Sequence, residues 1–163
     1  MPRSDGTASV ERVPDPDLEI RFRPMAPGDL DQVIVIERGF SSPWSREMFV
    51  QEIAQLEISD SRVAVVGPRV VGYVLWWYVA DEIHIVNLAV DPAFRRRGIA
   101  KRLLDTAFDC GRNRRMQIAT LEVRAGNAGA IALYESIDFR KVAIRRGYYA
   151  DNGEDAIVML KSL

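Results

Sequence analysis

The sequence predicts one α/β domain built on a mixed sheet, and three observations support this fold class. The chain has 163 residues, which suits a single domain, and 48% of them are hydrophobic, enough for a proper core. Segments with strand-like alternation and segments with helical periodicity follow one another in a mixed order. The sequence contains no internal repeat and no linker that would indicate a second domain.

The first part of the domain carries four strand-like and two helix-like segments. Pro24 ends the first strand, and Ser45 is a good N-cap for the second helix. The Gly67-Pro68-Arg69 turn separates two strands as in a hairpin, and Asp91-Pro92 stops a further strand. We expect strands over residues 19–23, 62–66, 70–78 and 82–90, and helices over residues 29–40 and 45–56.

The remainder of the chain alternates between strand and helix. Ile99, Leu103 and Leu104 recur at helical spacing, and Asn127 is a good N-cap for a short helix. A polar loop joins the last two strand-like runs. We expect helices over residues 98–110 and 127–136, and strands over residues 118–123, 139–144 and 156–160.

Composition excludes several classes of function. The net charge is -1, so the bulk basic field of a dedicated nucleic-acid binder is absent, and we expect no direct nucleic-acid binding. One cysteine, Cys110, and one histidine, His84, leave no intramolecular disulfide and no Cys-based or His-rich metal site, so no metal is expected. Residues 1–17 have no apolar run, which predicts a disordered tail before a domain at 18–163 and a cytoplasmic protein without a membrane anchor.

The segment from Leu88 to Ala100 is the most informative stretch. A buried strand ends, a short turn follows, and a helix begins near Gly98. A helix N-terminus presents free backbone N–H groups and the positive end of its dipole, and Gly98 lets an anion approach them. Neighbouring cations add attraction for a diphosphate. Neither P-loop nor G-x-G-x-x-G spacing is present, and a solvated basic helix start that binds nothing remains the alternative.

Two further residues carry candidate chemistry. Glu122 lies inside a strand expected near the sheet centre, where a carboxylate needs a partner or a wet cleft, and where desolvation would raise its pKa toward that of a general base. An ion pair with Arg124 or another arginine is the structural alternative. Tyr134 lies on the inward face of the helix after Asn127, either as core or as a donor to a polar partner.

The segment from Leu88 to Ala100 resembles motif A of the GCN5-related N-acetyltransferases (GNAT). Arg95, Gly98 and Ala100 fill the three fixed positions of the [RQ]-x-x-G-x-[GA] signature. The resemblance implies a sheet with splayed central strands, flanked by helices and mostly antiparallel, and acetyl-coenzyme A as the acetyl donor. It also implies that the coenzyme is bound by Leu88, Ala89 and Val90 of the strand, and by Arg96, Arg97, Gly98, Ile99, Ala100 and Lys101 of the loop and helix.

The stretches 121–124 and 127–135 resemble the bacterial ribosomal-protein alanine N-acetyltransferases (RimI type) and their archaeal relatives. That resemblance spans nearly all of residues 19–160. It implies acetylation of an N-terminal Ala or Ser, most simply of a ribosomal protein, by direct transfer in a ternary complex. It implies these site residues: Glu122 as general base, Tyr134 as general acid, Asn127 at the coenzyme, and Trp44, Tyr148 and Tyr149 at the substrate entrance.

Some residues and hypotheses stay open at this point. Asp138 departs from the family pattern, which has glycine there, and the tail has no counterpart. We interpret His84 and Cys110 as structural residues. At least one of Trp76 and Trp77 must face the core, and the other can line a groove. A lysine side chain or a small-molecule amine is an alternative acceptor. A non-catalytic acyl-coenzyme sensor is a third hypothesis, against which the presence of both Glu122 and Tyr134 argues.

Overall fold

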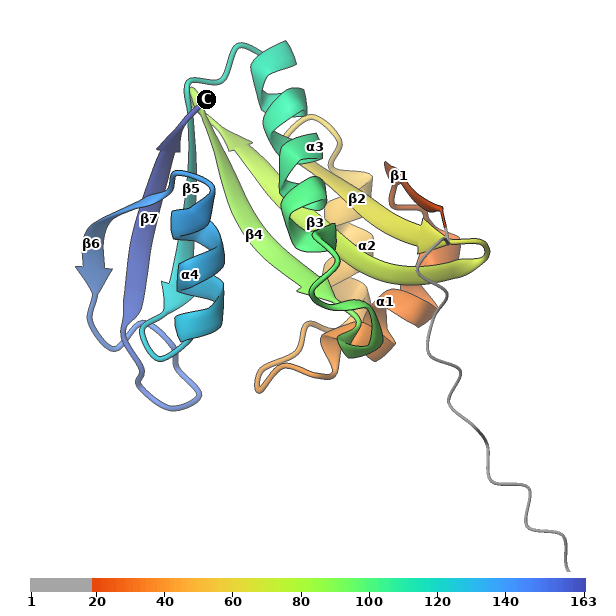
Figure 1. Ribbon diagram of the computed structural model, residues 1–163, viewed down its shortest axis with the longest axis horizontal. Helices are drawn as coiled ribbons and strands as arrows, with labels where there is room; N and C mark the ends of the chain where they lie inside the picture. Colours follow the sequence, from red (N-terminus) through yellow and green to blue (C-terminus); the bar gives the residue numbers. More distant parts are fainter. Residues whose placement is uncertain (1–18) are drawn as a thin grey trace, which may run out of the picture.

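A computed structural model of the chain describes residues 19–163 (Figure 1). The tail predicted over residues 1–17 lies outside the described residues. The helices and strands fall where periodicity and capping predict them, with ends that differ by a few residues, and Ser45 caps its helix by accepting from the Met48 N–H.

One seven-stranded sheet organises the described residues, in the order β1-β2-β3-β4-β5-β7-β6. All neighbours are antiparallel except β4 and β5, which run parallel. The predicted mixed, mostly antiparallel sheet is therefore confirmed. The strands are β1 (Ile20–Pro24), β2 (Ser59–Val66), β3 (Arg69–Val79), β4 (Glu82–Val90), β5 (Ile118–Arg124), β6 (Arg140–Arg145) and β7 (Ala156–Ser162).

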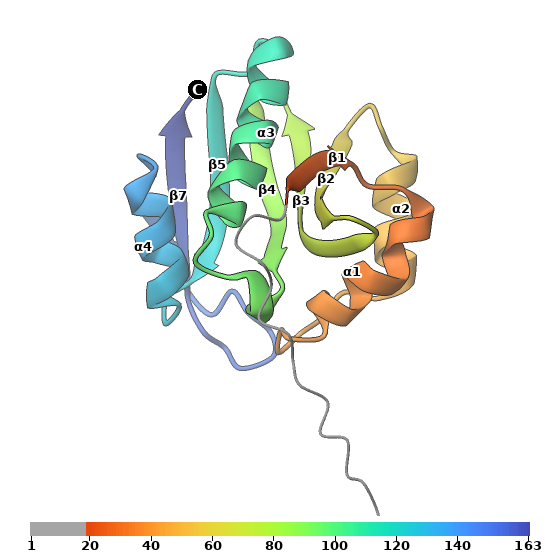
Figure 2. The ribbon, with the colours of Figure 1, turned by 45° about the vertical axis from the view of Figure 1, so that its right-hand side comes forward.

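Helices cover both faces of the sheet (Figures 1 and 2). On one face, Leu103 and Phe108 of α3 pack in a core that also contains Leu121 of β5. On the other face, Leu30 of α1 and Phe49 of α2 form a second core against β2 and β3. The helices are α1 (Leu30–Glu37), α2 (Arg46–Ala54), α3 (Ile99–Asn113) and α4 (Ala128–Ser136), with 3-10 turns at Pro27–Asp29 and Pro92–Phe94.

The central strands β4 and β5 separate after a short parallel contact. Their pairing begins at Glu82 with Ile118 and ends at Ile85 with Leu121, although both strands continue. Figure 1 shows the resulting gap, which widens toward the carboxyl ends of the two strands. Alternate backbone groups of β4 beyond Ile85 therefore face this gap rather than a neighbouring strand. The predicted splay of the central strands is confirmed.

The start of α3 is held close to the sheet by a glycine. A Cβ on Gly72 of β3 would lie 3.0 Å from the carbonyl oxygen of Ala89 and 3.3 Å from Leu103 Cδ1. No larger side chain fits without moving either β4 or α3. The absence of a side chain at this position thus lets the start of α3 lie directly against β3.

Asp138, the departure from the family pattern, lies in the turn between α4 and β6. Its φ is +74°, in the left-handed region that glycine adopts without strain. Aspartate is among the residues that visit this region most readily, because its short polar side chain can bond locally. Asp138 therefore adopts a backbone conformation that glycine would also adopt.

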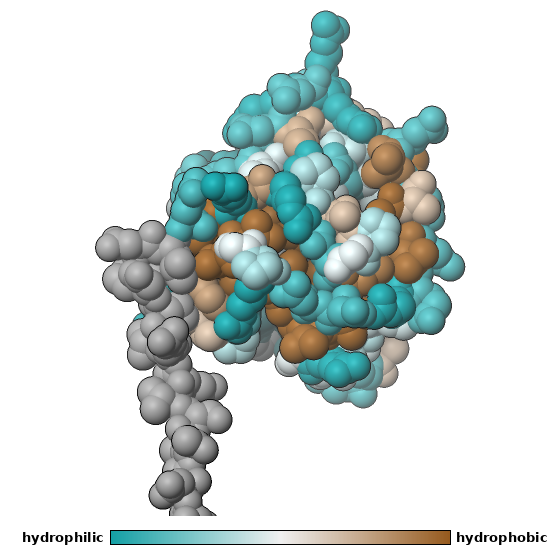
Figure 3. Space-filling model, turned by 90° about the vertical axis from the view of Figure 1, so that its right-hand side faces the viewer, coloured by the Kyte–Doolittle hydropathy of each residue, from teal (hydrophilic) through white to brown (hydrophobic). Residues whose placement is uncertain are grey.

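The surface mixes polar and apolar side chains, as Figure 3 shows for the face at the right of Figure 1. Helices α1 and α2 expose Val35, Met48 and Val50. None of the helices within residues 19–163 is long and apolar enough to cross a bilayer.

Candidate active site

A cavity of about 590 Å³ lies where β4, the start of α3 and α4 meet. We call it the coenzyme cavity. Its walls are mostly apolar, and cationic side chains stand at the α3 end. The predicted coenzyme residues that line it are Leu88, Ala89, Val90, Arg96, Gly98, Ile99, Ala100, Lys101 and Asn127.

The backbone at the start of α3 is shaped to present N–H groups to this cavity. Gly98 is the N-cap residue, with φ +72°, and no side chain of the described residues caps the helix. Arg96 is also left-handed, with φ +62°. Left-handed residues alternating with others turn successive N–H groups toward one side, which makes an anion-binding concavity. The site predicted from Gly98 therefore has donor groups that no side chain of the helix satisfies.

The arginines of the segment separate into two groups. Arg95 and Arg96 line the coenzyme cavity together with Lys101. Arg97 is absent from that lining, and its guanidinium lies 5.4 Å from the centroid of the Phe94 ring. The predicted role of Arg97 in coenzyme binding stays a prediction, whereas Arg95 gains a place in the wall.

A second cavity, of about 260 Å³, lies beside the first under the carboxyl ends of β4 and β5. We call it the acceptor cavity. Glu122, Arg124 and Tyr149 line it on the side of β5, and Glu37 and Trp44 line it on the side of α1. Five residues belong to the lining of both cavities: Phe40, Leu88, Asn127, Ala130 and Tyr134. The two cavities are thus two ends of one cleft.

Glu122 is one of two carboxylates, with Glu37, that line the acceptor cavity. Its side chain is 10% exposed, with Oε2 lying 2.8 Å from His84 Nε2 and Oε1 lying 3.4 Å from Arg145 Nε. The hydrogen bond from His84 lowers the pKa of Glu122 below its ordinary value, with the charges of His84 and Arg145 opposing the effect of burial. The expectation that burial would raise this pKa is therefore wrong, because the neighbouring donors outweigh desolvation.

The structural alternative for Glu122, an ion pair with Arg124 or another arginine, holds for Arg145 but not for Arg124. Arg124 follows Glu122 by two residues in β5, but its guanidinium pairs with Asp151 and Glu154. His84, which sequence reasoning set aside as structural, takes the position beside Glu122 instead. Its Nδ1 lies 3.0 Å from Thr120 Oγ1, and the Trp77 ring stacks on it with a centroid distance of 6.1 Å.

Tyr134 of α4 lies where the two cavities meet and belongs to the lining of both. Its ring packs at 5.7 Å from that of Phe139. Burial, with a smaller effect of Tyr149, raises the pKa of Tyr134 to about 12. The phenol therefore keeps its proton throughout the neutral range.

Asn127 and Trp44 are held in place by backbone contacts. The Asn127 side chain caps α4 by accepting from the Ala130 N–H at 3.1 Å. The Trp44 N–H donates to Glu37 Oε1 at 2.9 Å. Glu37 is 2% exposed and also accepts from the Tyr73 hydroxyl and from Asn87 Nδ2. Sequence reasoning missed Glu37, for which the available signal was a carboxylate directly after the apolar run 33–36.

The two tyrosines predicted at the entrance differ in position. Tyr149 lines the acceptor cavity, whereas Tyr148 is absent from the lining and is half-exposed, edge-on to the Tyr149 ring at 5.1 Å. Trp76 is fully buried in the core. Trp77 lines a separate shallow pocket beside α2 and donates from Nε1 to Glu52. Contact of Tyr148 with substrate stays a prediction.

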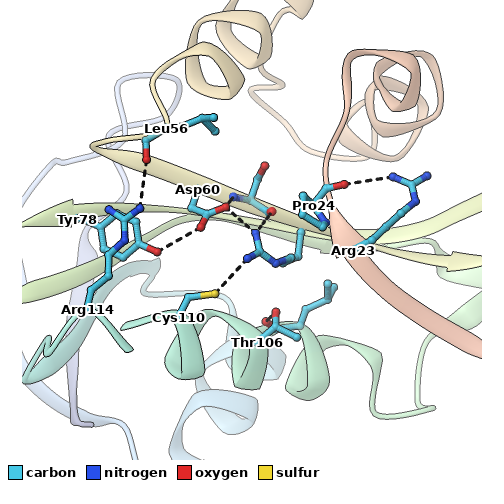
Figure 4. Close-up of polar contacts among 11 residues, drawn as sticks. Arg23, Pro24, Leu56, Asp60, Tyr78, Thr106, Cys110 and Arg114 are labelled. Carbon is cyan, nitrogen blue, oxygen red and sulfur yellow. Dashed lines mark hydrogen bonds and ion pairs between the residues drawn. The ribbon is translucent and has the colours of Figure 1, made fainter. Parts of the chain in front are cut away.

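Cys110 lies away from the cleft, in the second half of α3 (Figure 4). Its sulfur accepts a hydrogen bond from Arg62 Nη2 at 3.1 Å, beside Asp60 and Tyr78. Burial raises the pKa of the thiol despite the nearby Arg62 charge. A protonated thiol outside both cavities is poorly placed to carry an acetyl group.

Comparison with known proteins places this cleft in a family. The profile of the acetyltransferase (GNAT) family matches residues 31–139, more than half of the chain. The chain belongs to the GNAT family. It is 39% identical over 125 residues to the ribosomal protein bS18-alanine N-acetyltransferase of Salmonella typhimurium, covering 76% of this chain and 83% of that one.

Two further relatives of this acetyltransferase extend the comparison. An N-alpha-acetyltransferase of Saccharolobus solfataricus is 36% identical over 149 residues, covering 83% of this chain and 88% of that one. The crystal structure of the ribosomal-protein-S18-alanine N-acetyltransferase from Escherichia coli superposes with a TM-score of 0.80 at 34% identity, covering 88% of this chain and 94% of that one. The predicted family, fold class and class of enzyme, an acetyl-coenzyme A-dependent N-acetyltransferase, are confirmed.

Coenzyme affinity of this acetyltransferase should depend on Gly98. A Cβ at Gly98 meets nothing within 4 Å, so the Val side chain of Gly98→Val would stand in the open space before the α3 N–H groups. We expect acetyl-coenzyme A affinity, measured by calorimetry, to fall about tenfold or more because an anion can no longer reach those groups.

Gly67→Val is the matched control for this variant. Gly67 has φ +55°, has open space around it, and lines neither cavity. The left-handed backbone penalty of roughly 1–2 kcal/mol is thus shared, and only the Gly98 variant should lose affinity. Unchanged affinity in folded Gly98→Val would remove the anion site from this turn.

Glu122 should act in turnover rather than in coenzyme binding. Glu122→Gln keeps the size and the hydrogen bond to His84 but removes the base. We expect kcat to fall roughly 10²-fold or more with acetyl-coenzyme A affinity nearly intact. Glu82→Gln is the control, since Glu82 contacts Thr120 at 3.4 Å in the same polar network but lines neither cavity. Near-normal turnover of Glu122→Gln would leave Glu122 as a structural residue.

Proposed function

We propose that this acetyltransferase transfers the acetyl group of acetyl-coenzyme A to the α-amino group of a protein that begins with Ala or Ser, by direct transfer in a ternary complex. One observation carries the proposal: the coenzyme and acceptor cavities meet at Leu88 and Tyr134, with Glu122 beside the junction. The names of its relatives in Salmonella typhimurium and Escherichia coli support a ribosomal protein as acceptor, which would make this a cytoplasmic reaction.

The coenzyme cavity fits the proposed donor. The uncapped start of α3, with Arg96 and Lys101 beside it, suits a diphosphate. The apolar remainder of the cavity, along Ala89 and Leu133, suits the pantetheine arm. When bound, acetyl-coenzyme A supplies an acetyl thioester, whose carbonyl would lie near the junction of the two cavities.

Glu122 removes a proton from the acceptor ammonium in this mechanism, directly or through one water. Its lowered pKa makes it a weak base, ready in the ionised form at neutral pH. His84 and Arg145 hold its two oxygens and so fix the direction from which the proton arrives. The neutral amine then forms the new bond to the acetyl carbon.

Two other groups serve the carbonyl and the leaving group. A backbone N–H of the Leu88–Val90 segment, facing the gap between β4 and β5, stabilises the oxyanion, a role typically worth about 3 kcal/mol. As the carbon–sulfur bond breaks, Tyr134 gives its proton to the departing sulfur. The nitrogen, now bonded to the acetyl carbon, loses its second proton, which restores the phenol, and the first proton taken from the ammonium leaves through Glu122. The protonated state of the phenol at neutral pH supports this assignment.

The weak base favours an α-amine over a lysine side chain as the acceptor. An α-amine has a pKa of about 7.7–8.0 and a lysine amine about 10.4, so deprotonating lysine takes about 3.4 kcal/mol more. Trp44 and Tyr149 line the acceptor cavity, where they are placed to contact the first residue of an acceptor. The names of the relatives, which are alanine N-acetyltransferases, support a small first residue such as Ala or Ser.

We therefore expect acetylation of peptides beginning with Ala or Ser, and little reaction at internal lysines or free polyamines. Peptides with a free N-terminus and an internal lysine are incubated with enzyme and acetyl-coenzyme A, and fragmentation mass spectrometry locates the acetyl group. N-terminally blocked copies of the same peptides are the control. Preferential modification of the lysine would refute the proposed acceptor and leave only the family assignment.

The pH dependence of kcat/KM should report the substrate amine. Because the pKa of Glu122 is lowered, its carboxylate is ionised throughout the neutral range, and its contribution to folding stability is lost only below about pH 4.3. We expect kcat/KM for an Ala peptide to rise with pH up to about 7.7–8.0 and then level. A limb near pH 6 that Glu122→Gln abolishes would show instead that Glu122 titrates as the limiting base.

A further inference from the structure

Arg124, at the end of β5, is bound to a single loop over residues 146–155, which joins β6 to β7. Its Nη2 lies 2.9 Å from Asp151 Oδ2, and its Nη1 lies 3.2 Å from Glu154 Oε1. The same Nη1 donates to Asn152 Oδ1 at 3.3 Å. One guanidinium thus contacts the three polar side chains on either side of Gly153, those of Asp151, Asn152 and Glu154. The Arg124 side chain is only 23% exposed.

The same guanidinium also lies on the ring that faces the acceptor. Its carbon is 3.9 Å from the centroid of Tyr149, within the range of a cation–π contact. Tyr149 lines the acceptor cavity, and so does Arg124. The orientation of the Tyr149 ring, and hence the shape of this wall, depends on where Arg124 places its charge.

Asp151 carries the contact across to the opposite wall of the cavity. Its Oδ2, which pairs with Arg124, also accepts from the Ser41 hydroxyl at 3.1 Å. Ser41 belongs to the loop between α1 and α2, which lines the other side of the acceptor cavity. Figures 1 and 2 place both loops at the same edge of the sheet, below the carboxyl ends of β4 and β5. The two walls meet through one carboxylate.

Removal of the arginine charge would release this arrangement. The Asp151 and Glu154 carboxylates converge on one cation, and without it they would repel each other. Glu154 keeps a second attachment, because Oε2 accepts from the Gly126 N–H at 2.8 Å. Within residues 19–163, Asp151 has only the Ser41 hydroxyl as a partner besides Arg124 and its own loop. The Asp151 end of the loop would therefore move first.

We propose that Arg124 is a positioning residue for the acceptor. It acts through Tyr149 and Asp151, holding the 146–155 loop against Ser41, and so sets the affinity for the acceptor peptide but not for the coenzyme. The kinetic part of the proposal rests on the proposed function, because it needs a peptide acceptor. The structural part, the attachment of the loop, is independent of what the acceptor is.

The kinetic test compares Arg124→Met with the wild-type enzyme on an Ala peptide. We expect the KM for the peptide to rise about tenfold or more and the KM for acetyl-coenzyme A to stay within about twofold. Arg23→Met is the matched control. Arg23 lies on β1, makes a bidentate pair with Asp29, and lines neither cavity. An unchanged peptide KM, or an equal rise in both constants, would overturn the proposal.

A double-variant cycle tests the route through Tyr149. If Arg124 acts by placing that ring, Tyr149→Ala combined with Arg124→Met should raise the peptide KM little more than the worse single variant does. Fully multiplicative effects would show that the two residues act separately. Asp151→Asn, which keeps the size of the side chain, should also raise the KM for the peptide, by a smaller factor. This variant replaces Arg124→Met in the test if Arg124→Met does not fold.

Hydrogen exchange tests the attachment without any acceptor. The Tyr149 N–H donates to the Glu154 carbonyl and the Gly153 N–H to the Tyr149 carbonyl. We expect both amides to exchange about tenfold or more faster in Arg124→Met, with α4 unchanged. If the wild type fails to acetylate peptides, the proposed function fails, but this measurement still tests whether Arg124 holds the 146–155 loop. Equal exchange in both proteins would overturn it.

Discussion

The early end of the β4–β5 pairing is the constraint on which the rest of this acetyltransferase depends. Ile85 and Leu121 form the last parallel pair, and beyond them the two strands diverge. A sheet cannot leave two interior strands unpaired without giving their backbone groups other partners or a ligand. Here the divergence opens the cleft that α3 and α4 border, so the gap in the ladder and the substrate site are the same feature.

The same parallel pairing sets the electrostatics of the cleft. It places His84 opposite Thr120, and Glu122 follows Thr120 by two residues on the same face of β5. His84 can therefore bond to both side chains at once. The result is a carboxylate that is buried yet easily ionised, because its donors more than compensate for lost water. Such a group accepts protons weakly, which suits a substrate that is already close to neutral.

Much of the architecture could be predicted because the signals are local. Ser45 and Asn127 cap the helices they precede, and Gly98 opens α3, each within a few residues of the position that periodicity indicates. The site was predictable only in part. The contact between His84 and Glu122 depends on which strand lies beside β5, and the partners of Arg124 lie in a loop after two further elements. No local pattern carries that information.

The lining of the coenzyme cavity comes from both sides of the gap. Leu88 and Ile99 belong to the part before β5, and Asn127 and Tyr134 belong to the part after it. A ligand bound there bridges two regions that the sheet itself joins through four residue pairs. Binding that requires both regions in place is linked to their association, and it stabilises the native state by about 2.7 kcal/mol at a ligand concentration of 100 Kd. The cellular concentration of acetyl-coenzyme A would then contribute to the fraction of this protein that is folded.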